Sequence, residues 1–505
     1  MQAFPEPPGD DDPVTTPAAG GAGTFDAPPG DGTFDAPPGD GTFDAPPGDG
    51  TGSPAEAPGP PAPPAAPPPT PRRWPWVAVV AIAAVLAAGG GALTWQAGKG
   101  TLAPEQAPRP TTAGAPSTSA GRAESHRASL ATLLAARSRA VLGHDKAAFL
   151  ATVDPAEKAF RDKQATVFDR VARVPLGSWE YDYAGEGPGL GGARAAALPK
   201  GSWVARVILH YKYAGGDSPV DREQYLTVVP RDGRWLIAGD DDVAASGLAT
   251  ERDIWDLGPI DVVRGRHSLV IGDARPSALR DYAADADRSV RDVDAVWKKD
   301  WSRRPVVIVP KSQADMATII GSDGDGLDQI AAVTTGYSVS GPTRGDRVVI
   351  NPSAWKGLGD LGRRVVMAHE VTHLATRAIT VHAVPIWLSE GFADYVAYQA
   401  VDVPTRVVAS DVLDQVREGK GPKRLPEDGD FDAARGDLAP AYEGAWLACR
   451  MLAERYGQAK LIALYVALAD RDSGLPEKDI RRVLGISEDK LVADWRAYLA
   501  QQARR

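Results

Sequence analysis

Two histidines and a glutamate lie close enough together in the sequence to bind and use a metal ion. They are His369, Glu370 and His373, within the segment VVMAHEVTHL. On a helix, residues four apart lie one above the other, so both imidazoles point to one side and can bind one Zn²⁺ at roughly 2.0–2.1 Å each. Glu370 then lies near the open coordination position, where it can take a proton from water. The spacing predicts a zinc site with Glu370 as general base.

A catalytic zinc site takes three protein ligands and leaves one position open, so a third ligand must lie elsewhere. The metzincin pattern would require Gly and His where this chain has Thr376 and Ile379, which excludes that class. His382 is available, but it lies in the turn before Pro385 at no familiar ligand spacing. Glu390 is the stronger candidate, because Pro385 can begin a second helix that carries Glu390 back toward the first.

The second helix contains the phrase Trp-Leu-Ser-Glu-Gly-Phe-Ala-Asp-Tyr, residues 387–395. Together with His-Glu-Val-Thr-His, this phrase resembles the gluzincin clan, the peptidase MA-like zinc metallopeptidases that include thermolysin and aminopeptidase N. The resemblance implies Zn²⁺ as cofactor, with metal ligands at His369, His373 and Glu390. It also implies Glu370 as general base and Asp394, one turn after Glu390, as the acid that orients a ligand imidazole.

A further phrase, AYEGAWLACRMLAERYG from Ala441 to Gly457, resembles the aminopeptidase helix whose tyrosine stabilises the transition state. Tyr442 falls on that tyrosine; a phenol donating to the developing oxyanion is typically worth ~2.7–4 kcal/mol. The alternative is a packed aromatic at the start of a helix. Glu390 follows His373 by seventeen residues, a shorter interval than in those families, and the Gly-x-Met-Glu-Asn phrase that binds a free amine is absent. The resemblance therefore favours an endopeptidase acting on a peptide or protein.

The elements around the motif suit a buried site. The metal-binding helix is predicted to start after Asp360, a good N-cap, and its apolar residues lie nearly all round it, which indicates a central helix. Before it, Arg347 to Asn351 is predicted to be a strand that ends at Pro352. A charge at its start and a proline at its end favour a sheet edge, where an extended peptide could add as the next strand.

Two α+β domains are expected: residues 126–250 as a cone-shaped domain and residues 255–505 as the metallopeptidase domain. In the first, helical spacing gives way to period-two alternation, and a hairpin is predicted to turn at residues 230–233. That order, with the phrase VLGHDKAAFLATVDP, resembles the nuclear-transport-factor-two-like fold. No catalytic constellation occurs there, so a spacer or substrate-presenting module is expected.

The first 125 residues lack the composition of a packed domain. Residues 1–71, rich in Pro, Gly and Asp, contain the unit GTFDAPPGD three times in tandem and are expected to be a disordered tail. Residues 72–98 are predicted to be a single transmembrane anchor, because twenty uncharged residues follow a pair of arginines. The anchor is expected to lie in the cell membrane, and the paired arginines predict that the N-terminus is on its cytoplasmic side. A linker, residues 99–125, then leads to extracytoplasmic domains.

Composition narrows the function further. The net charge is −10, but eleven acidic residues precede Arg72 and the rest of the chain is near neutral, so no nucleic-acid surface is expected. Cys449 is the only cysteine, which excludes intrachain disulfides and cysteine-rich metal sites. The sequence thus predicts a membrane-anchored zinc endopeptidase. The alternative is a non-catalytic surface protein that binds a ligand or envelope component, with a structural zinc completed by a fourth ligand such as His382.

Overall fold

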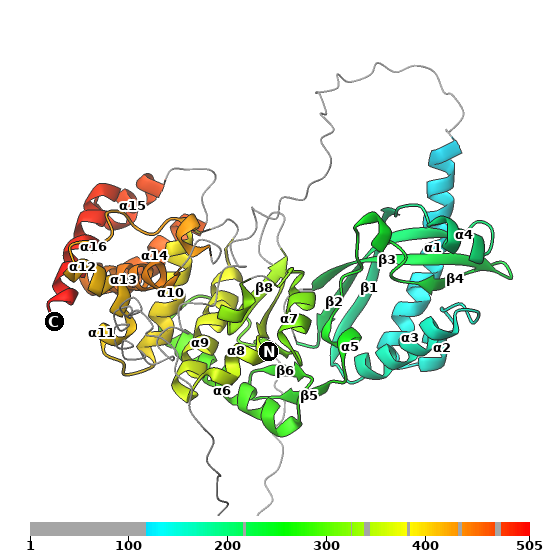
Figure 1. Cartoon of the computed structure of the whole chain (residues 1–505), viewed down its shortest axis with the longest axis horizontal. Coiled ribbons are helices and arrows are strands. Elements are labelled where there is room, and N and C mark those ends of the chain that lie inside the picture. Colours follow the sequence, from blue (N-terminus) through cyan, green and yellow to red (C-terminus); the bar gives the residue numbers. More distant parts are fainter. Residues whose placement is uncertain are drawn as a thin grey trace, which may run out of the picture. The chain divides into compact units, whose positions relative to one another are not determined.

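The structure, a computed structural model, combines two β-sheets with a C-terminal set of helices, so its architecture is α+β (Figure 1). It describes residues 118–215, 219–324, 326–337, 344–380, 384–432, 437–469 and 476–505. All of them belong to one compact unit, Thr70 to Arg505. The predictions made for residues 1–71 and for the linker as far as residue 117 lie outside the described residues.

The prediction of a membrane-anchored fold is contradicted by the helices of the structure. Across the described residues, no helix is both long and apolar enough to cross a membrane. The longest of them, α1 (Thr118–Leu142), has 25 residues, but it carries five charged ones; each would cost about 2.5–3.5 kcal/mol at the centre of a bilayer. The segment predicted as the anchor, 72–98, lies outside the described residues. The single-pass anchor is therefore not retained, nor are the membrane location and orientation inferred from it.

The first sheet follows three helices and is antiparallel throughout. Its strands are hydrogen-bonded in the order β1-β2-β3-β4. The elements of this half are α1, α2 (Lys146–Leu150), α3 (Lys158–Val171), β1 (Leu176–Glu186), α4 (Gly192–Ala197), β2 (Trp203–Tyr213), β3 (Val220–Arg231) and β4 (Arg234–Gly239). Asp232 and Gly233 form the predicted turn between β3 and β4, with φ of 49° and 74°, as a type I′ hairpin requires. This order, helices followed by an antiparallel sheet, is the one predicted. The resemblance of this region to the nuclear-transport-factor-two-like fold remains a prediction.

The second sheet is mixed and lies between helices. Its order is β5-β6-β7-β9-β8, with β6, β7 and β9 parallel and the two outer strands antiparallel. The central run Val-Val-Ile-Val of β7 is buried throughout, as expected for a parallel strand covered on both faces. The elements are α5 (Ile254–Leu257), β5 (Asp261–Arg264), β6 (Leu269–Gly272), α6 (Pro276–Val296), β7 (Val306–Val309), α7 (Gln313–Ile320), β8 (Ala332–Tyr337), β9 (Arg344–Ile350), α8 (Pro352–Gly357) and α9 (Asp360–Arg377).

The strand predicted to form the sheet edge lies inside the sheet. β9 pairs with β7 on one side and β8 on the other, so β8 is the edge strand. Arg347, taken as a sign of exposure, is 1% exposed and pairs with Asp253. Pro352 belongs to the first turn of α8, where a missing N–H costs nothing. The charge of Arg347 is thus explained by a buried ion pair and the position of Pro352 by the start of a helix, and neither marks a sheet edge.

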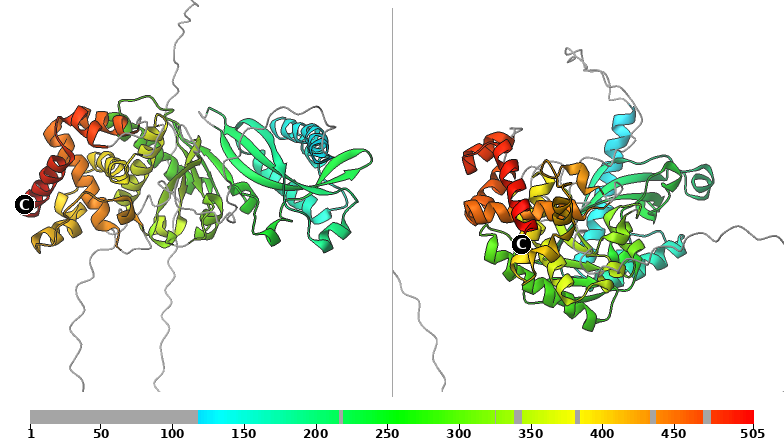
Figure 2. Two further views of the ribbon diagram at one scale, coloured as in Figure 1. Left: turned by 90° about the horizontal axis from the view of Figure 1, so that it is seen from above. Right: turned by 60° about the vertical axis from the view of Figure 1, so that its left-hand side comes forward.

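The remaining helices cover the zinc-motif helix and take part in one large hydrophobic core. They are α10 (Ile386–Gln399), α11 (Thr405–Val408), α12 (Ser410–Arg417), α13 (Ala439–Tyr456), α14 (Gln458–Ala469), α15 (Pro476–Leu484) and α16 (Glu488–Ala503). In Figure 2 the orange and red helices gather beside the yellow α9 and α10, and α10 packs along both α9 and α13. One hydrophobic core extends from α6 through α9 and α10 to α16.

A second core joins the two sheets. It contains Trp179 and Tyr211 of the first sheet and Ile308 and Val349 of the second. This core contains residues from both sides of the proposed domain boundary. The division into domains near residues 250–255 therefore remains a prediction.

Buried charges lie within this junction. Asp253 accepts hydrogen bonds from the Tyr211 hydroxyl at 2.9 Å and from Arg222 Nε at 3.0 Å. Arg347 Nη2 lies 3.3 Å from Asp253 Oδ1, and Arg347 Nη1 donates to the Tyr211 oxygen at 3.1 Å. One carboxylate thus faces two guanidinium groups.

Glu443 of α13 predicts a pH dependence of stability. Its carboxylate is 7% exposed and accepts the Val412 N–H at 2.7 Å, and burial raises its pKa from 4.5 to about 8. Between these values the folded chain binds more protons than the unfolded chain, so the free energy of unfolding falls as pH rises, by up to about 1.4 kcal/mol per pH unit. Urea unfolding at pH 5, 6.5 and 8 measures the slope. Glu443→Gln should reduce it and Glu418→Gln, at an exposed position, should not; equal slopes in both variants would contradict the assignment.

Candidate metal centre

Helix α9 places His369, Glu370 and His373 in the buried interior of the protein. His369 and His373 are each 1% exposed and Glu370 is fully buried. The helix begins at Asp360 itself, with Gly359 as N-cap, one residue earlier than predicted. α9 packs against α6, α10 and β8, and this burial on several sides explains why its apolar residues surround it.

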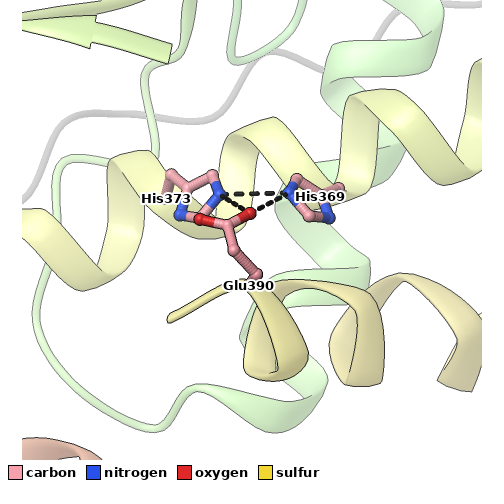
Figure 3. A group of neighbouring side chains, drawn as sticks. All are labelled: His369, His373 and Glu390. Carbon is pink, nitrogen blue, oxygen red and sulfur yellow. Dashed lines mark hydrogen bonds and ion pairs between the residues drawn. The ribbon is translucent and has the colours of Figure 1, made fainter. Parts of the chain in front are cut away.

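Glu390 reaches the two histidines from α10. Figure 3 shows both imidazoles pointing from α9 toward the Glu390 carboxylate. His369 Nε2 lies 3.1 Å from His373 Nε2 and 3.2 Å from Glu390 Oε2, and His373 Nε2 lies 3.4 Å from Glu390 Oε2. Together they form a buried group whose ligand atoms converge.

The separations fit a zinc ion. Bonds of about 2.0–2.1 Å at tetrahedral angles place the ligand atoms of zinc about 3.3–3.4 Å apart, close to the three separations in this group. Three nitrogen and oxygen atoms so arranged leave a fourth tetrahedral position, as a catalytic site requires. His369, His373 and Glu390 are therefore the residues that would hold the metal.

Asp394 lies one turn after Glu390 and contacts His369 at the Nδ1 side of its ring. Its Oδ1 accepts a hydrogen bond from His369 Nδ1 at 2.8 Å, and its side chain is buried. This bond places the proton of a neutral imidazole on Nδ1, so the Nε2 lone pair faces Glu390 and His373. Such a bond fixes the tautomer and the ring orientation of a metal ligand.

The electrostatics of the group favour cation binding. Burial lowers the pKa of His373 to about 4, which keeps this imidazole neutral. Against the effect of burial, Asp394 and Glu390 raise the pKa of His369 well above its usual value, and the neighbouring imidazoles lower the pKa of Glu390 to about 2. A neutral His373 and an ionised Glu390 are metal-binding forms, whereas His369 must release a proton when a metal binds.

Glu370 follows His369 on α9, and its two carboxylate oxygens have different surroundings. Oε2 accepts a hydrogen bond from Thr334 Oγ1 of β8 at 2.7 Å, whereas the buried Oε1 has no hydrogen-bond donor within the described part of the chain. Burial raises the pKa of Glu370 to about 7, the range in which a carboxyl group can both accept and release a proton near neutral pH. Sequence reasoning missed Thr334, because a threonine in a strand gives no sign of which distant residue it meets.

Tyr442, predicted to stabilise the transition state, is not one of the three converging residues. Tyr442 lies on α13 with its ring buried and edge-on to Phe431 at 5.1 Å, and its catalytic role remains a prediction. His382, the alternative ligand, lies outside the described residues.

Replacing Asp394 by asparagine tests the contact with His369. We expect zinc affinity to fall about 10–100-fold, because the imidazole loses its charged acceptor and its fixed tautomer. Titration of zinc against a competing chelator measures the change, with Asp402→Asn at an exposed position as the control. An unchanged affinity would show that Asp394 does not orient the ligand.

Gly391 allows the close approach that places Glu390. A Cβ at this position would lie 2.3 Å from the Ala445 carbonyl oxygen of α13, so α10 cannot stay in place with a larger residue. Gly391→Ala should destabilise the fold by about 1–3 kcal/mol and weaken zinc binding by displacing Glu390. Thermal unfolding and zinc titration measure both, with Gly192→Ala as control, since a Cβ there meets nothing within 4 Å. Wild-type zinc affinity in Gly391→Ala would contradict this role.

Comparison with known proteins is consistent with a peptidase in the C-terminal part of the chain. Residues 353–501 match a family model described as the Peptidase MA superfamily. No curated protein matches the chain. The matched residues contain the whole His–His–Glu group, Glu370, Asp394 and Tyr442, but neither β8 nor the first sheet. Residues 353–501 are thus similar to the peptidase MA superfamily, and this part of the chain has a peptidase-like scaffold.

Proposed function

We propose that the chain is a zinc-dependent metallopeptidase that hydrolyses internal peptide bonds. The observation that carries this proposal is the buried group of His369, His373 and Glu390, whose ligand atoms lie 3.1–3.4 Å apart. The peptidase-like match over residues 353–501 supports it independently. The absence of the amine-binding phrase in the sequence favours cleavage within a chain over removal of its first residue.

Each residue near the metal position has a chemical task in this proposal. When bound, Zn²⁺ supplies a Lewis acid that polarises the scissile carbonyl and lowers the pKa of water. Glu370 accepts the proton of the attacking water at Oε1 and delivers it to the leaving amine. Asp394 keeps the His369 ring in its ligand orientation through the 2.8 Å hydrogen bond.

The edge strand β8 offers a place for the substrate. It is the outer strand of the second sheet beside β9, and its residue Thr334 contacts Glu370 directly. An extended peptide that pairs with β8 would gain main-chain hydrogen bonds and pass close to the base. The substrate is therefore proposed to be an extended peptide or an unfolded protein segment.

The proposal is tested with the zinc-loaded chain and a library of unstructured peptides, with products identified by mass spectrometry. We expect cleavage at internal bonds that stops with 1,10-phenanthroline and returns when zinc is added. The absence of cleavage by a chain with one bound zinc would contradict the proposal and favour a structural metal site. Cleavage that persists after zinc is removed would contradict it in another way, by excluding a role for the metal.

A further inference from the structure

Thr334 contacts the proposed general base from a strand outside the peptidase-like match. Its Oγ1 lies 2.7 Å from Glu370 Oε2 and 3.0 Å from the Glu370 backbone oxygen. Thr334 is 1% exposed and Glu370 is fully buried. A hydroxyl has one proton to donate, and the shorter of the two contacts goes to the carboxylate. A hydrogen bond to a charged acceptor away from water is among the stronger ones in a protein.

The contact restrains one carboxylate oxygen and leaves the other available. Oε2 is held by Thr334, while Oε1 meets no donor in the described parts of the chain. With one oxygen fixed, the carboxylate cannot rotate freely about its last bond. The oxygen that takes the proton therefore has a defined position.

Thr334 is itself held by the metal-binding helix. Arg377, one turn after His373 on α9, donates from Nη1 to the Thr334 carbonyl oxygen at 3.0 Å and lies 3.5 Å from Asp346 Oδ1. Because Asn351 N donates to Ala331 O, the antiparallel pattern turns the backbone groups of residue 331 toward β9 and those of residue 334 away from it, at the outer edge of the sheet. The side chain and carbonyl of Thr334 thus both bind α9.

We infer that Thr334 is a positioning residue for the base: its hydroxyl holds Glu370 Oε2 so that Oε1 faces the reacting water. This inference rests on the proposed function and extends it, because it connects the edge strand proposed to bind substrate with the group that moves the proton. The simpler alternative is that Thr334 only fills space. Valine and serine separate the two, since valine keeps the shape of threonine without the hydroxyl and serine keeps the hydroxyl without the methyl group.

The first experiment requires no activity and measures whether the two residues are coupled. Thermal unfolding of the full chain is compared for Thr334→Val, Glu370→Ala and the double variant. We expect Thr334→Val to lower Tm in the wild-type background and to have a smaller effect in Glu370→Ala, where the carboxylate is gone and only the backbone oxygen of residue 370 remains as acceptor. Equal effects in both backgrounds would overturn the inference.

The second experiment measures kcat and KM for the zinc-loaded chain on a peptide that it cleaves. Thr334→Val should lower kcat about 10–100-fold with little change in KM or zinc content, as expected for a misplaced catalytic group, and Thr334→Ser should restore most of it. Thr227→Val is the matched control: Thr227 is fully buried in the first sheet and donates to Asp242 at 2.6 Å. It should lower stability without lowering kcat.

The outcomes distinguish this inference from the proposed function. Wild-type kcat in Thr334→Val, or a larger loss in Thr334→Ser than in Thr334→Val, would show that Thr334 only fills space. Coupling between Thr334 and Glu370 in a chain that cleaves no peptide would overturn the hydrolytic function alone, and would leave Thr334 as the residue that holds this carboxylate.

Discussion

Glu370→Gln is expected to lower kcat for peptide cleavage by about 10²–10⁴-fold, the usual contribution of a general acid–base group. Glutamine keeps the size of the side chain and can still accept the Thr334 hydrogen bond, but it cannot take a proton from water. Zinc binding should remain at one ion per chain, because Glu370 is not one of the three converging residues. The variant therefore separates proton transfer from metal binding.

Kinetics on the same cleaved peptide and zinc analysis of the same samples measure these two effects. Glu488→Gln, an exposed position on α16, is the control and should keep wild-type kcat. A Glu370→Gln chain that retains wild-type kcat would exclude Glu370 as the base. Loss of zinc together with activity would instead indicate that Glu370 is itself a metal ligand.

Asp253→Asn is expected to cost about 3–5 kcal/mol of stability, the effect of removing one partner from a buried ion pair. Asp253 is 3% exposed and Arg347 is 1% exposed, so water cannot replace the missing charge. Two guanidinium groups, of Arg222 and Arg347, would lose their shared carboxylate. Asparagine keeps the shape and can still accept the Tyr211 hydrogen bond, which limits the change to charge.

Urea unfolding at pH 7 measures this loss. Asp261→Asn is the matched control, because its partner Arg173 lies 3.3 Å away at an exposed position, and exposed pairs contribute only about 0–1 kcal/mol. A similar small effect in both variants would show that the Asp253 group is screened by solvent. Because the Asp253 group joins β3 to β9, a large effect would mean that the two sheets depend on each other for stability.

The histidine pair was accessible from sequence because helix geometry fixes it locally, whereas the role of Asp394 came from the resemblance to the gluzincin clan. His373 is four positions after His369 on α9, and Asp394 is four positions after Glu390 on α10. Once the two helices pack together, these intervals place both members of each pair on one face. The structure brings the first three within 3.4 Å of one another and Asp394 to 2.8 Å from His369. The packing of the two helices against each other had to be assumed.

The identity of the edge strand and the role of Thr334 could not be predicted from the sequence, because both depend on contacts between distant segments. The order of strands in a sheet is not encoded by any one strand, and the charge of Arg347 suggested exposure because its partner, Asp253, lies far away in the sequence. Thr334 likewise meets Glu370 only after β8 pairs with β9 and α9 packs against the sheet. Residue type and spacing contain no information on either arrangement.

The most direct test of the account is the zinc content of the purified chain after refolding with excess zinc and removal of the unbound metal. The account predicts one zinc per wild-type chain, with the ion lost or bound far more weakly in Glu390→Ala, which removes one of the three converging ligands. A wild-type chain without zinc, or a Glu390→Ala chain that binds zinc as tightly as wild type, would contradict it.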